Sequence, residues 1–202
     1  MKRFIAGYFL LMSLMILSGV AGAKEIRVKK KWFLSDTTTH PKKQLEALRI
    51  QRSLIIDGIL DEPEWQQASE AGAFYTYSPS IGDSSKHDTR VRALYNNEAI
   101  YFGAVLYDQP DKITDGLSKR DDHNPNADRF WVTLNPYNDG KNIFQFEVTA
   151  ANVQSDIKIS PRNHDRAWDA VWNSAVTKTD KGWIVEIRIP YDAIRFPKTR
   201  VQ

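Results

Sequence analysis

Aromatic and charged side chains recur at positions where they could form a binding surface. Trp168 and Trp172 are four residues apart in a run that we interpret as one strand, so both indoles would point to one face, about 13 Å apart. Trp131 alternates away from an apolar face and stands beside Arg129. Indole rings stack on flat apolar surfaces of a ligand, and charged side chains hydrogen-bond its polar groups. The candidate ligand-binding residues are Trp172, Trp168, Trp131, Arg92, Arg129 and Glu147.

A purely structural interpretation of these residue types stays open. Arg92, Glu147 and Arg188 alternate with apolar residues, so they could form a cross-strand ladder of charges on a solvated sheet face. Trp65 and Trp183 each begin an apolar periodic run, and we expect both in the core. A core position is the alternative for the other tryptophans as well.

Two acidic groups have the hard oxygen ligands that calcium prefers. One comprises Asp121, Asp122 and Asp128; the other comprises Asp57, Asp61 and Glu62. Neither group has the spacing of an EF-hand, so a solvated acidic loop is the alternative in each case. The first group is the candidate site for a structural calcium ion, and no organic cofactor is expected.

The sequence lacks the motifs of several common catalytic sites. It contains no GxSxG, P-loop or GxGxxG motif and no cysteine. Its four histidines lie in polar segments without HExxH or paired spacing, so we expect no zinc site. Two carboxylates distant in the chain could still form a glycoside hydrolase pair. A small chain rich in aromatic residues is nevertheless explained more simply as a binding module than as an enzyme.

Short strands must position these side chains, because apolar and polar residues alternate in runs about ten residues apart. The runs are 54–56, 89–95, 99–107, 129–134, 144–148, 168–176 and 183–189. Only 62–69 and 191–194 look helical. We predict an all-β fold, a jelly-roll-like antiparallel β-sandwich.

The alternation also predicts which side chains are inside. The interior should hold Ile56, Val91, Ala93, Tyr95, Phe130, Val132, Phe146, Val148, Trp183, Val185 and Ile187. The intervening polar residues should be outside, among them Arg92, Gln145, Glu147, Glu186 and Arg188.

The first 23 residues have the plan of a secretory signal peptide. Lys2 and Arg3 precede an uncharged run of 14 residues, 4–17, and the small residues Ala21-Gly22-Ala23 follow. We predict cleavage after Ala23 and export to the periplasm, the outer membrane or the medium. A membrane helix is the alternative, although the run is shorter than the ~20 residues that span a bilayer.

The rest of the chain has nearly balanced charges and divides into a leader and one domain. Without residues 1–23 it has 26 basic and 25 acidic side chains, so we expect no nucleic-acid partner. Residues 24–47 are a basic, polar leader, with an arm for polyanions or membrane surfaces as the alternative to a plain linker. Residues 48–200 form the predicted sandwich domain.

Several strings, taken in order, resemble a known family. Residues 56–65 read IDGILDEPEW, and the hairpin 91–107, the strings DRF and FEV, and 182–190 follow in the same order as in family 9 carbohydrate-binding modules and their DOMON-like relatives. NVQSD at 152–156, WDAVW at 168–172 and EIRIP at 186–190 are similar to strings of exported bacterial proteins. Those proteins carry such a module before an outer-membrane β-barrel region of unknown function. The resemblance covers roughly residues 48–197.

This resemblance implies a β-sandwich that binds a poly- or oligosaccharide without catalysis and serves carbohydrate catabolism through attached or partner proteins. Calcium is a recurrent structural ion in such modules. The chain stops at Gln202 where those relatives continue, so we expect a truncated piece whose own barrel region is a second candidate partner. Two alternatives stay open: an interaction domain of a barrel protein, and a small glycoside hydrolase or cofactor-binding DOMON-like domain.

Overall fold

The computed structural model describes residues 43–78, 80–123 and 126–194. The predicted signal peptide, most of the leader at 24–47 and the end of the predicted domain after residue 194 lie outside the described residues. In the part of the chain that is described, no helix is long and apolar enough to cross a membrane.

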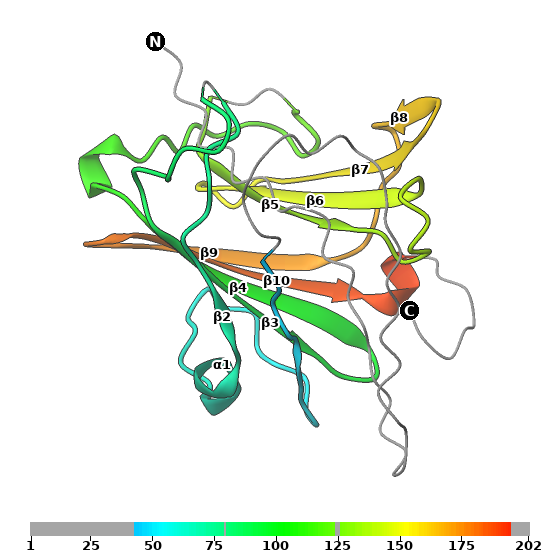
Figure 1. Cartoon of the computed structure of the whole chain (residues 1–202), viewed down its shortest axis with the longest axis horizontal. Helices are drawn as coiled ribbons and strands as arrows, with labels where there is room; N and C mark the ends of the chain where they lie inside the picture. Colours follow the sequence, from blue (N-terminus) through cyan, green and yellow to red (C-terminus); the bar gives the residue numbers. More distant parts are fainter. Residues whose placement is uncertain (1–42, 79, 124–125, 195–202) are drawn as a thin grey trace.

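Two sheets stacked face to face build the fold (Figure 1). The larger sheet has the order β1-β3-β4-β10-β9, and β2 pairs with β3. Its strands are β1 (Leu48–Arg49), β2 (Glu70–Ala71), β3 (Thr89–Tyr95), β4 (Ala99–Tyr107), β9 (Asn173–Thr179) and β10 (Gly182–Pro190). The smaller sheet has the order β5-β6-β7-β8, with β5 (Arg129–Leu134), β6 (Ile143–Thr149), β7 (Gln154–Ser160) and β8 (Asn163–Asp165).

Helical structure is limited to α1 (Pro63–Gln67) and two 3-10 turns, η1 (Pro110–Lys112) and η2 (Tyr191–Ala193), within the described residues. β1 pairs with β3 in parallel, whereas the other strand pairs are antiparallel. The predicted β-sandwich is therefore confirmed. Both short helical segments that the sequence indicated are present as well.

The main core lies between the sheets and follows the predicted alternation. One buried cluster contains Val91, Ala93, Phe130, Val132, Phe146, Val148, Trp183, Val185 and Ile187. Every second side chain of a strand points to the same face, so this cluster confirms the register of β3, β5, β6 and β10. Tyr95 is buried as well. The prediction for Ile56 is wrong, because it packs against a second cluster on the other face of the larger sheet.

Residues 50–69, here called the covering segment, close that other face. In Figure 1, α1 lies on the side of the larger sheet opposite to β5, β6 and β7. Trp65 of α1 is fully buried and stands above Gly103, where a Cβ would come within 3.1 Å of the indole ring. The predicted strand at 54–56 is irregular instead, because Leu54 packs on the sheet face rather than pairing at its edge.

Glu186 of β10 anchors the covering segment. Its Oε2 accepts hydrogen bonds from the backbone N–H groups of Asp57 at 3.0 Å and Gly58 at 3.1 Å. Gly58 has φ +83°, and a Cβ there would lie 2.9 Å from the Thr177 hydroxyl, so only glycine makes this turn without strain. Glu186 does alternate outward as predicted, but the covering segment buries it completely. Burial raises the pKa of Glu186 to about 7, against the effect of the two N–H donors.

The second half of the smaller sheet differs from the prediction. β7, with the sequence QSDIKIS, was not predicted, because its apolar residues are few. The strand expected over 168–176 begins only at Asn173, so Trp168 and Trp172 lie in the loop between β8 and β9. The four-residue spacing of these two tryptophans therefore does not place them on one strand.

Candidate functional site

The outward side chains of β5, β6 and β7 bring together half of the predicted sugar-binding residues. Trp131 of β5 stands opposite Glu147 of β6, which stands opposite Ser155 of β7. In the adjacent row, Thr133 of β5 stands opposite Gln145 of β6, which stands opposite Ile157 of β7. We call these two rows together with Arg129 the outer β5–β7 face, which comprises Arg129, Trp131, Thr133, Gln145, Glu147, Ser155 and Ile157.

Arg129 and Glu147 form an ion pair at one end of this face. The guanidinium Nη1 lies 3.4 Å from Glu147 Oε1 and also donates to the His123 carbonyl at 3.4 Å. Only 15% of the Arg129 side chain and 10% of the Glu147 side chain are exposed. Burial raises the pKa of Glu147, and the charge of Arg129 opposes this rise. The two charges thus compensate each other, and little of either group is left for a ligand.

Trp172 belongs to the core, and its predicted role as a stacking platform is wrong. The residue is 5% exposed, and its ring meets Phe146 edge to face at 5.3 Å. Its Nε1–H donates to Asp156 Oδ2 at 3.0 Å. Trp168 packs against the same core, with its ring 5.0 Å from that of Phe144. Since neither ring lies on the outer β5–β7 face, the two do not join Trp131 in one surface.

A network around Asp156 holds these tryptophans in place. Asp156 is fully buried, and it accepts hydrogen bonds from Ala170 N–H at 3.0 Å and from Arg120 Nη2 at 2.6 Å, besides the Trp172 indole. Arg120 also reaches Asp169 at 3.0 Å. Burial raises the pKa of Asp156, while its donors lower it. Sequence reasoning did not single out Arg120 and Asp156; the available signal was that NVQSD and WDAVW both resemble strings of related proteins.

Arg92 lies on the far side of the molecule from Arg129 and Glu147. It belongs to β3 of the larger sheet, on the face that the covering segment closes, opposite Gly103. Its Nη2 pairs with Glu70 at 2.9 Å. The prediction that Arg92 shares a site with the charged residues of the smaller sheet is therefore wrong. Alternation shows that a side chain points outward, but it does not show to which sheet a strand belongs.

The acidic groups do not form the expected calcium site. Within the described residues, no three histidine or acidic side chains gather so that they could hold a metal ion. Asp128 Oδ2 instead accepts the Thr114 N–H at 3.0 Å, and Asp121 Oδ1 accepts the Asp156 N–H at 3.3 Å. The grouping of Asp121, Asp122 and Asp128 as metal ligands is wrong, as is that of Asp57, Asp61 and Glu62. Calcium binding itself stays a prediction.

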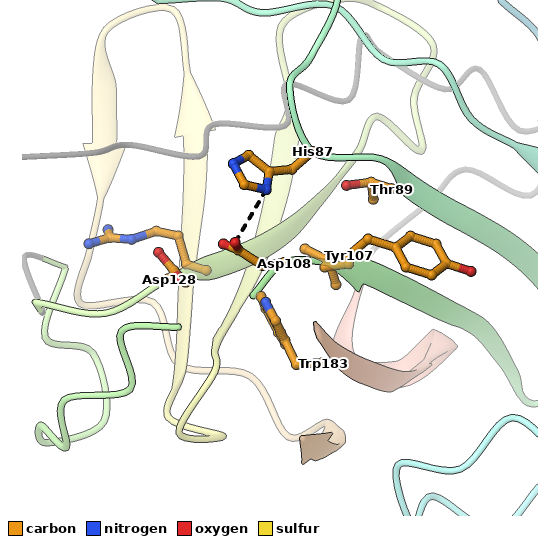
Figure 2. Close-up of a pocket in the computed structure, with 8 residues that line it drawn as sticks. His87, Thr89, Tyr107, Asp108, Asp128 and Trp183 are labelled. Carbon is orange, nitrogen blue, oxygen red and sulfur yellow. Dashed lines mark ion pairs between the residues drawn. The ribbon is translucent and has the colours of Figure 1, made fainter. Parts of the chain in front are cut away.

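A small pocket opens where β3, β5 and β10 begin and β4 ends (Figure 2). His87 Nδ1 points into it and lies 3.3 Å from Asp108 Oδ1, and Trp183 forms the opposite wall. Burial raises the pKa of Asp128 beside it, and the nearby Asp108 adds to the rise. The pocket has room for about one water molecule, which is far too small for a sugar ring. The outer β5–β7 face is therefore the candidate functional site.

Comparison with known families identifies the fold's relatives. A family model described as "Carbohydrate family 9 binding domain-like" matches residues 56–201, well over half of the chain. The chain belongs to this family. The predicted resemblance to family 9 carbohydrate-binding modules is thereby confirmed. Among curated protein sequences, no match was found.

Two solved structures of family 9 modules from Caldicellulosiruptor kristjanssonii have a similar fold. One, in complex with glucose, has a TM-score of 0.51 and 18% identity, and the match covers 74% of this chain and 71% of that one. The other, in complex with cellotriose, has a TM-score of 0.50 and 16% identity, with coverage of 72% and 67%. At this level of identity the likeness shows that the β-sandwich is shared.

Proposed function

We propose that this family 9 domain is a non-catalytic carbohydrate-binding module. The observation that carries the proposal is the family match over residues 56–201. The two similar structures support it, since they are complexes with glucose and with cellotriose. The outer β5–β7 face supports it as well, because Trp131 stands there among polar side chains on a sheet face outside the core.

In this proposal, one face of a sugar ring packs against the Trp131 indole. The apolar face of a pyranose gains by covering an aromatic surface, whereas its hydroxyl groups need donors and acceptors around the ring. Trp131 is half-buried, so part of its side chain is exposed to a ligand. Trp168 and Trp172 then contribute stability rather than affinity.

The test is a glycan array or affinity-gel screen of the chain, with and without added calcium. The informative variant is Trp131→Ala, which should weaken binding to the selected glycan by about thirtyfold, the usual cost of an aromatic anchor. Tyr107→Ala is the matched control, because Tyr107 is an exposed aromatic residue on the larger sheet. Unchanged affinity in Trp131→Ala would remove Trp131 from the site, and a screen without any binding would overturn the proposed function.

Trp172→Ala provides the contrast between a binding and a core tryptophan. The substitution empties a buried site and leaves Asp156 with one donor fewer, so we expect a loss of about 3–5 kcal/mol in the free energy of unfolding. Urea unfolding followed by circular dichroism measures this loss. Trp131→Ala should stay close to the wild type in the same assay, because its ring lies outside both core clusters.

We also propose that the protein is exported and that its sugar binding serves carbohydrate catabolism through attached or partner proteins. The basic, apolar and small-residue segments of residues 1–23 support export. Amino-terminal sequencing of the expressed protein should find Lys24 as the first residue. A product that still begins with Met1 in the membrane fraction would contradict this proposal.

A further inference from the structure

Gln145 is a polar side chain on the outer β5–β7 face that has no hydrogen-bond partner in the described part of the chain. It stands between Thr133 of β5 and Ile157 of β7 and is half-buried. Among the described residues, none forms a hydrogen bond with its carboxamide, although this group offers two N–H donors and one acceptor oxygen. The same holds for the Thr133 hydroxyl. The two neighbouring side chains thus present unused hydrogen-bonding groups to the surface.

The charged residues of this face, in contrast, already have partners. Arg129 and Glu147 pair with each other at 3.4 Å, Arg129 also donates to a backbone carbonyl, and both side chains are largely covered. Recruiting either one to a ligand would break a covered ion pair, which is costly because it leaves a charge unpaired. An uncharged amide with free donors has no such cost.

The spacing brings Gln145 within reach of a ligand on Trp131. Trp131 is directly opposite Glu147, so Gln145 is its diagonal neighbour on the next strand. Diagonal neighbours in an antiparallel pair have Cα atoms about 7–8 Å apart, which a long side chain and an aromatic ring bridge readily. One sugar unit resting on the indole would therefore have its edge beside the carboxamide.

We propose that Gln145, assisted by Thr133, forms hydrogen bonds with adjacent hydroxyl groups of a saccharide unit that packs on Trp131. This inference rests on the proposed function and assigns specificity to an uncharged pair of side chains. A planar carboxamide donates to one hydroxyl and accepts from its neighbour, so it selects units with two adjacent hydroxyl groups in suitable positions. The Arg129–Glu147 pair shapes the end of the face and does not contact the sugar.

The experiment compares affinities for the glycan selected by the array, measured by calorimetry on the full chain. Gln145→Ala should lower affinity about threefold to tenfold, the worth of one or two neutral hydrogen bonds, and should flatten the preference between glycans that differ in one hydroxyl. Thr133→Val, which keeps the shape and removes the hydroxyl, should have a smaller effect in the same direction. Gln67→Ala, an exposed glutamine of α1 on the far side of the larger sheet, is the control and should match the wild type.

Glu147→Gln separates this inference from the alternative that the charged pair reads the hydroxyls. It should retain both affinity and glycan preference. A large loss in Glu147→Gln together with wild-type binding by Gln145→Ala and Thr133→Val would overturn the role of Gln145 while leaving the proposed function intact. If the wild type binds no glycan, the proposed function and this inference both fall.

Discussion

Asp156 and Glu186 are both fully buried carboxylates, yet their partners differ. Asp156 is paired with the Arg120 guanidinium, whereas Glu186 accepts hydrogen bonds from the two neutral N–H groups of Asp57 and Gly58. Its Oε1 is buried without a hydrogen-bond partner among the described residues. Glu186 therefore favours its protonated form in the folded protein, and the free energy of unfolding must depend on pH.

The first prediction is that Glu186 makes the protein less stable as the pH rises. Its pKa is about 7 in the folded protein and 4.5 when unperturbed, so between these values the folded state holds a proton that the unfolded state has lost. The contribution is complete below pH 4.5 and is lost as the pH rises through 7. The pKa difference corresponds to on the order of 3 kcal/mol.

Urea unfolding of the wild type and of Glu186→Gln at several pH values measures this contribution. Glutamine keeps an oxygen for the Asp57 and Gly58 N–H groups but does not titrate. The difference in the free energy of unfolding between the two proteins should change steadily from pH 5 to pH 8 in favour of the variant. A difference that is constant with pH would show that Glu186 titrates normally.

Individual residues of the candidate site were predictable where alternation within a strand decides their position, and not where a distant contact does. Trp131, Arg129 and Glu147 were grouped correctly, because period-2 alternation within two neighbouring strands places them on one face. Trp172 was misplaced, because its burial depends on a hydrogen bond to Asp156 on a strand that was not predicted. Local patterns contain no information on such a contact.

At the scale of elements, the covering segment is the feature that the sequence did not indicate. Hairpin β3–β4 and the pairing of β9 with β10 follow from turn residues between alternating runs. The larger sheet, however, is buried on both faces, and the run 99–107 of β4 already showed this by being apolar on both sides. What covers its second face comes from residues 50–69, whose contacts are distant in sequence.

We predict that Gly103→Ala destabilises the protein through this element. The new Cβ would lie 2.7 Å from Leu60 and 3.1 Å from Trp65, so the covering segment has to shift, at a cost of about 1–3 kcal/mol. Gly72→Ala is the control, since its Cβ would meet only the flexible Arg90 side chain at 3.1 Å. Thermal unfolding compares the two. Equal melting temperatures would mean that the covering segment is not packed tightly over β4.

At the scale of the whole molecule, the larger sheet is shared by both clusters of buried residues. β3 and β4 supply Val91 and Phe102 to the cluster between the sheets, and Leu94 and Tyr101 to the one beneath the covering segment. Loss of either cluster exposes one face of the same strands. The two clusters should therefore unfold together.

The corresponding prediction is a single cooperative transition. Urea unfolding followed by far-ultraviolet circular dichroism, which reports the sheets, should coincide with unfolding followed by hydrogen exchange at Trp65 and its neighbours in the covering segment. If the amide protons of residues 50–69 exchanged at a clearly lower urea concentration than that at which the circular dichroism signal is lost, the two clusters would not unfold together.

The large sequence separation between Glu186 and the backbone groups that it binds has a consequence for biosynthesis. The carboxylate that holds Asp57 and Gly58 is 129 and 128 residues further along the chain, and β10 is also the strand between β4 and β9. A ribosome therefore releases the amino-terminal signature well before the strand that secures it. Until β10 has been synthesised, the larger sheet lacks an inner strand, so this domain cannot complete its fold.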